Sequence, residues 1–99
     1  MRNRFLIYKT GPTEGGIFVD GGGGDGIVKI GTVFTQARYW GSGPFPGEGE
    51  TKPIHLTVVK ILAYGHELDE LPSPITGRLF LQGEGAEELA SDVIIFSDE

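Results

Sequence analysis

The chain has 99 residues, of which 38% are hydrophobic and 22% charged, and this is the size and composition of one globular domain. It contains no cysteine, which excludes a disulfide framework and a thiolate metal site. No apolar run has the length of a membrane span, and the N-terminus does not resemble a secretory signal. We therefore expect a single cytoplasmic domain over residues 1–99 that has no membrane contact.

The net charge of −6 is concentrated in the last third of the chain. Residues 67–99 carry nine acids and one base, Arg78, whereas residues 1–66 carry seven bases and five acids. Binding to nucleic acid depends on Lys and Arg side chains that displace counterions from phosphates. The acidic third therefore disfavours a nucleic-acid partner, and any such contact would have to use the basic N-terminal part. The simplest role of the acids is to keep a small domain soluble.

Short β-type segments follow one another along the chain and are separated by turn residues. A helical period is weak throughout, and only Gly85–Leu89 is a candidate for a single helical turn. Many short strands at close spacing predict an all-β fold, a small closed or nearly closed, mostly antiparallel β-barrel of about six or seven strands. In chain order, the predicted strands lie at Arg4–Lys9, Gly16–Asp20, 26–29, 32–35, Leu56–Tyr64, Ile75–Leu81 and Asp92–Phe96, with a tight turn near Lys29–Gly31.

A long inter-strand loop is predicted at about 37–55, because five glycines and prolines between Gly41 and Gly47 disfavour a regular strand. Three aromatic residues lie in or beside this stretch, Tyr39, Trp40 and Phe45. Exposed, clustered aromatics tend to mark contact sites. These three are therefore candidate binding residues for a protein or ribonucleoprotein partner. An alternative is that Trp40 folds back and closes one end of the barrel.

No pattern in the chain predicts a catalytic residue, a metal site or a cofactor. The glycine run Asp20–Gly26 lacks the Lys-Ser/Thr of a phosphate loop, and a calcium site would need a different spacing of carboxylates. We interpret this run as a flexible turn between strands. His55 and His66 lack zinc-ligand spacing, and no serine lies in a recognisable nucleophile motif.

Two blocks of sequence resemble the second, β-barrel domain of elongation factor Tu and related translational GTPases. The first block, from Gly21 to Gly31, is similar to the family pattern Gly-x-x-x-x-Gly-x-(Val/Ile)-Lys-x-Gly. The second runs from Ile61 to Ile94 and includes Arg-Leu-Phe-Leu-Gln-Gly at 78–83. The resemblance as a whole runs from Phe5 to the C-terminal strand and covers nearly the whole chain except residues 37–55. Gly26 and Gly31 are expected to bracket a turn, with Ile27, Val28 and Ile30 directed into the barrel.

In that family the domain helps to hold the aminoacylated end of tRNA. The resemblance places Gly23 and Leu62 at the positions that hold the terminal adenine, where neither offers the family's contacts. Tyr64 and Thr76 match the aminoacyl pocket and keep a ring and a polar group. We therefore expect a non-catalytic binding module that does not carry aminoacyl-tRNA. The alternative is a small-molecule-binding or RNA-binding barrel with a pocket near Tyr64 and Thr76.

Overall fold

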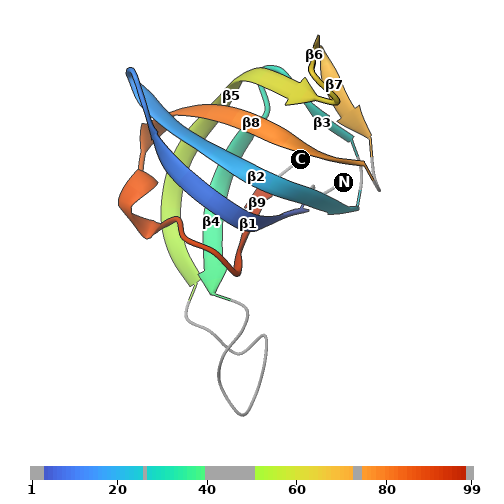
Figure 1. Cartoon of the computed structure of the whole chain (residues 1–99). Coiled ribbons are helices and arrows are strands. Elements are labelled where there is room, and N and C mark those ends of the chain that lie inside the picture. Colours follow the sequence, from blue (N-terminus) through green and yellow to red (C-terminus); the bar gives the residue numbers. More distant parts are fainter. Residues whose placement is uncertain (1–3, 26, 40–50, 73–74, 98–99) are drawn as a thin grey trace.

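The computed structural model describes residues 4–25, 27–39, 51–72 and 75–97 (Figure 1). In this part of the chain nearly every element is a strand, and one short 3₁₀ turn, η1, confirms the predicted helical turn. The elements are β1 (Arg4–Thr13), β2 (Gly16–Asp25), β3 (Ile27–Lys29), β4 (Val33–Tyr39), β5 (Thr51–Ala63), β6 (His66–Leu68), β7 (Glu70–Pro72), β8 (Thr76–Glu84), η1 (Ala86–Glu88) and β9 (Val93–Ser97).

Six of the described strands close into a barrel, in the order β4-β9-β1-β2-β8-β5, and the pairing of β4 with β5 completes the ring (Figure 1). All of these pairings are antiparallel. Strand β6 adds to the C-terminal end of β5 outside the ring, and β3 pairs with β7 in a separate two-stranded sheet. The predicted closed, antiparallel, all-β barrel is therefore confirmed.

The core lies inside the ring because side chains alternate between the interior and the outer face along each strand. In β8, Leu79 and Leu81 are buried while the neighbouring Arg78 and Phe80 are only partly covered. The same alternation buries residues from every strand of the ring. The largest fully buried side chains are Phe5, Ile7, Val19, Phe34, Leu56, Val58, Ile61, Leu79, Leu81 and Ile95, with Val28 of β3 beside them.

The glycine run is part of strand β2, so its interpretation as a turn was wrong. Gly21 pairs with Ile7 of β1 and with Gly77 of β8. A Cβ atom at Gly21 would lie 1.8 Å from the carbonyl oxygen of Leu6, so only glycine allows β1 to approach this closely. Locally the run has the composition of a turn, but the packing of a neighbouring strand explains the glycine.

The predicted loop at 37–55 is shorter than expected. Strand β4 continues to Tyr39 and β5 begins at Thr51, with Ala37 opposite Lys52 and Arg38 opposite Thr51. Strand β4 is also paired on its other edge past Ala37, because Arg38 lies opposite Ile94 and Tyr39 opposite Val93 of β9. The connection between the two strands comprises residues 40–50, which lie outside the described part of the chain.

The predicted turn after β3 is confirmed. Gly31 has a φ of +93°, and its N–H donates to the carbonyl of Val58 at 2.8 Å. The expected inward direction holds for Val28, which is buried, but it was wrong for Ile27 and Ile30, which are 42% and 44% exposed. Exposure alternates along β3, so Ile27 and Val28 cannot both face inward, and Ile30 lies in the turn that follows the strand.

Candidate functional site

Two paired glycines lie where strands β2 and β8 run side by side. Gly21 is opposite Gly77 in the register, between the pairs Asp20–Arg78 and Gly22–Thr76. A Cβ atom on Gly77 would lie 2.9 Å from the carbonyl oxygen of Leu62. The backbone of this glycine pair lines a hollow on the outer face of the barrel, between the side chains of the flanking residues.

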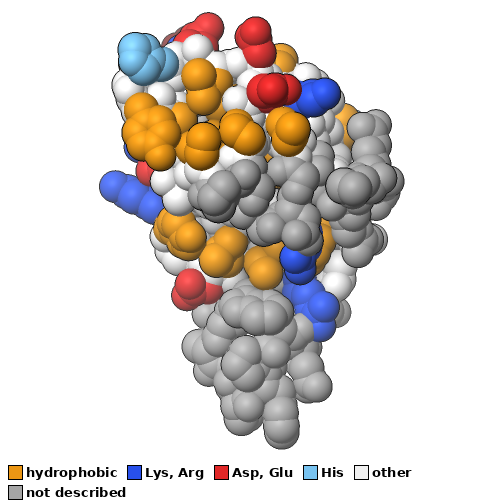
Figure 2. All heavy atoms as spheres, turned by 90° about the vertical axis from the view of Figure 1, so that its right-hand side faces the viewer, with side chains coloured by type: hydrophobic (Ala, Val, Ile, Leu, Met, Phe, Trp, Pro, Cys, Tyr) orange, Lys and Arg blue, Asp and Glu red, His pale blue; other side chains and the backbone are white. Residues whose placement is uncertain are grey.

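The hollow is an open depression with a volume of about 470 Å³. Strand order places Tyr8 of β1 on one side of the glycine pair and the end of β5, with the turn that follows it, on the other. Figure 2 views the side of the molecule where β3, β6 and β7 lie and shows that hydrophobic side chains gather on it. The residues that line this tyrosine depression are Tyr8, Asp20, Gly21, Leu62, Ala63, Tyr64, Gly65, Thr76, Gly77 and Arg78.

Tyr64 occupies a two-residue hairpin turn between β5 and β6. Tyr64 and Gly65 have φ angles of +53° and +76°, as a type I′ turn requires. Asn, Asp or Gly is favoured at the first of these positions, because a larger side chain is strained at positive φ. The Tyr64 side chain is 78% exposed, so its partial burial at most balances that strain. The turn therefore directs an aromatic ring to the surface at a local conformational cost, a feature that often marks a functional site.

Tyr8 reaches the same depression from a β-bulge. The pairing of β1 with β2 shifts register between Ile7 and Lys9, and Tyr8 lies in this irregularity with 56% of its surface exposed. Bulges redirect side chains in this way. A Cβ atom on Gly22 would be 3.7 Å from Tyr8 Oη and 3.3 Å from Thr76 Cγ2. The Gly22 backbone therefore lies close to both of these side chains.

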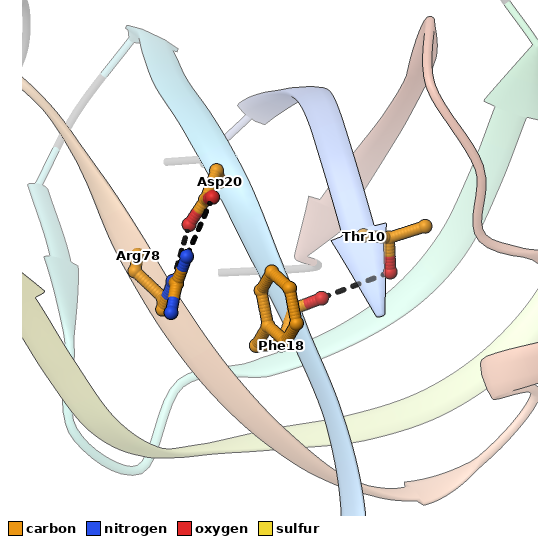
Figure 3. Close-up of polar contacts among 4 residues, drawn as sticks. All are labelled: Thr10, Phe18, Asp20 and Arg78. Atoms are coloured by element: carbon orange, nitrogen blue, oxygen red, sulfur yellow. Dashed lines mark hydrogen bonds and ion pairs between the residues drawn. The ribbon is translucent and has the colours of Figure 1, made fainter. Parts of the chain in front are cut away.

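A cross-strand ion pair forms one wall of the depression (Figure 3). Arg78 Nε donates to Asp20 Oδ1 at 2.6 Å, and Arg78 Nη2 donates to Asp20 Oδ2 at 3.0 Å. The Asp20 carboxylate raises the pKa of the Arg78 guanidinium above its ordinary value. The guanidinium also lies over the Phe18 ring, 4.2 Å from its centroid. On the neighbouring strand, Thr10 Oγ1 donates to the backbone carbonyl of Phe18 at 2.9 Å. The charge of Arg78 is thus compensated by Asp20, and one face of its guanidinium packs on Phe18.

The structure brings Tyr64, Thr76 and Leu62 together in the depression. The role of Tyr64 and Thr76 as binding residues stays a prediction, whereas Leu62 is expected only to lack the family's contact with the terminal adenine. Tyr39 ends β4, while Trp40 and Phe45 lie outside the described residues, so the candidate site on the loop also stays a prediction. Sequence reasoning did not find Tyr8, or the pairing of Asp20 with Arg78. The alternation along β2 and β8 places both members of that pair on the outer face, but the register that joins them depends on the fold.

Within the described ranges, no group of three or more His, Cys, Asp or Glu residues is placed to hold a metal ion. The same part of the chain includes no helix that has the length and apolar character needed to cross a membrane.

No family model and no curated protein matches this chain. Solved structures that are similar to it include two of translation elongation factor SelB from Methanococcus maripaludis, one in the apo form and one in complex with the GTP analogue GppNHp. Each has a TM-score of 0.74 and 18% sequence identity over 99% of this chain. The chain spans 19% of the length of the SelB chain. The expected likeness to a translation-factor barrel, of the kind found as the second domain of elongation factor Tu, is therefore confirmed as the fold of this protein.

Proposed function

We propose that the chain is a non-catalytic binding module on a translation-factor-type barrel, and that the tyrosine depression is its contact site. The observation that carries this proposal is the exposure of two tyrosines beside one hollow, one of them in a strained turn. Tyrosine is favoured in binding sites because it buries a large area and loses little side-chain entropy. The partner is a protein or ribonucleoprotein of the translation apparatus, and the site of action is the cytoplasm.

A binding role fits the chemistry of the depression better than catalysis does. Among its described lining residues there is no histidine, cysteine or serine. The one carboxylate, Asp20, is engaged by Arg78 in two hydrogen bonds and is therefore poorly placed to act as a general base. Exposed rings over a glycine floor offer contact area instead.

A small molecule is a second candidate ligand, because a volume of about 470 Å³ falls in the range typical of ligand pockets. A thermal-shift screen against a panel of metabolites would separate the two candidates. A metabolite that raises the melting temperature of the wild type, but not of a Tyr64→Ala variant, would favour the small-molecule function. If the ligand is a macromolecule, no metabolite in the panel needs to raise the melting temperature.

Site-specific photo-crosslinking tests the proposed contact directly. A photoreactive phenylalanine analogue placed at position 64 reports on the depression, and the same analogue at position 59 is the matched control. Val59 lies on β5, the strand that precedes Tyr64, and is 41% exposed, but it does not line the depression. We expect position 64, but not position 59, to give an adduct that mass spectrometry identifies as a ribosomal protein or translation factor. Equal labelling from both positions would contradict the proposed site.

A further inference from the structure

The wall of the tyrosine depression restricts the charge of the group that can bind there. Its described lining residues include a single cation, Arg78, and Asp20 already engages that cation in two hydrogen bonds. A phosphate that approached Arg78 would meet the Asp20 carboxylate next to it, with no further Lys or Arg in the lining to offset the repulsion. The described lining of the depression therefore offers a phosphate no uncompensated cation.

The rest of the depression suits an uncharged ring. Leu62 and Ala63 are apolar, and the floor at Gly21 and Gly77 has no side chains. Aromatic rings prefer to meet in offset or edge-to-face arrangements, for which exposed tyrosine rings on both sides provide partners. The Arg78 guanidinium, which lies over Phe18, adds a flat surface on which a ring can stack.

We infer that Asp20 is a specificity-determining residue, which makes the tyrosine depression accept an uncharged aromatic side chain of a protein partner and reject a ring that carries a phosphate. This inference, which rests on the proposed function, assigns the selection to one ion pair. The net charge of −6 favours the same class of ligand, because a negatively charged surface repels the backbone of a nucleic acid.

Two small probes separate the ligand classes in an NMR titration of the full chain. N-acetyl-tryptophan amide presents the uncharged ring of a protein side chain, and adenosine 5′-monophosphate presents a ring with a phosphate. In the wild type we expect the tryptophan probe to shift the resonances of Tyr8 and Tyr64, and the nucleotide to leave them unchanged. In Asp20→Asn, where Arg78 regains an uncompensated charge, we expect the nucleotide to bind at least about tenfold more tightly. Affinity for the tryptophan probe should stay within about twofold of wild type.

Two further variants keep the result interpretable. Asp20→Ser should give the same result as Asp20→Asn, so that either variant can serve if the other fails to fold. The double variant Asp20→Asn with Arg78→Gln should lose the gained nucleotide affinity if Arg78 is its source. Nucleotide binding by the wild type that equals binding of the tryptophan probe, or no gain in either Asp20 variant, would overturn the role of Asp20. If neither probe shifted Tyr8 or Tyr64 in any variant, the proposed contact site would fail with it.

Discussion

Replacement of Tyr64 by Asn should leave the stability of the fold almost unchanged. With 78% of Tyr64 exposed, only about a fifth of its surface is buried, roughly 40 Å² if a fully buried tyrosine covers about 200 Å². At about 25 cal/mol per Å², the loss of this contact costs about 1 kcal/mol. In the opposite direction, a left-handed conformation costs a residue such as tyrosine about 1–2 kcal/mol, and asparagine tolerates it better. The two effects nearly cancel, so the free energy of unfolding should change by less than about 1 kcal/mol.

Urea denaturation followed by circular dichroism measures this difference. For a small domain the expected shift of the midpoint is less than about 1 M. Ile61→Ala, on the strand that precedes Tyr64, is the control, because Ile61 is fully buried and its truncation should cost about 2–5 kcal/mol. A loss of more than about 2 kcal/mol for Tyr64→Asn would mean that the ring supports the fold, and its assignment to binding would be wrong.

The remaining predictions concern a turn, the nucleic acid and the loop. Gly31→Val should lower the free energy of unfolding by about 1–3 kcal/mol. The cause is the φ of +93° at this residue alone, because no atom lies within 4 Å of the added Cβ. Gly31→Asn should lose much less stability in the same urea assay, because asparagine tolerates this conformation. The isolated chain should show no binding to aminoacyl-tRNA by fluorescence anisotropy at physiological salt, and micromolar, salt-sensitive affinity would count against the expected loss of the adenine contacts at Gly23 and Leu62. Trp40→Ala should change stability by less than about 1.5 kcal/mol while it weakens partner binding. A blue-shifted emission from Trp40, protected from quenchers, would instead indicate that this residue closes the barrel.

Much of the fold could be predicted from local sequence, because strand residues and turn residues alternate along the chain. The turn at Gly31 and the helical turn near Glu88 were found in this way. What escaped prediction depends on contacts between distant segments. The glycine run around Gly21 has the composition of a turn, and only the close approach of the Leu6 backbone explains its place in a strand. Similarly, nothing local to Ile27 indicates that β3 joins a second sheet.

The residues of the candidate site also fall into those found from the sequence and those whose role depends on the fold. Tyr64 and Thr76 were found because the chain resembles a family whose pocket uses those positions. Asp20 and Arg78 are 58 residues apart, and their ion pair exists only because β2 and β8 are neighbours in the barrel. Tyr8 is a further case, since its exposure follows from a bulge in the pairing of β1 with β2, which composition alone does not indicate.

The affinity of the cross-linked partner for wild type and for a double variant, Tyr8→Ala with Tyr64→Asn, tests the contact site most directly. Val59→Ala serves as the surface control, and urea denaturation of all three proteins verifies that they are folded. If the tyrosine depression is the contact site, the double variant should bind at least about tenfold more weakly, while the control binds as the wild type does. Equal affinity of the wild type and a folded double variant would contradict a contact at this depression.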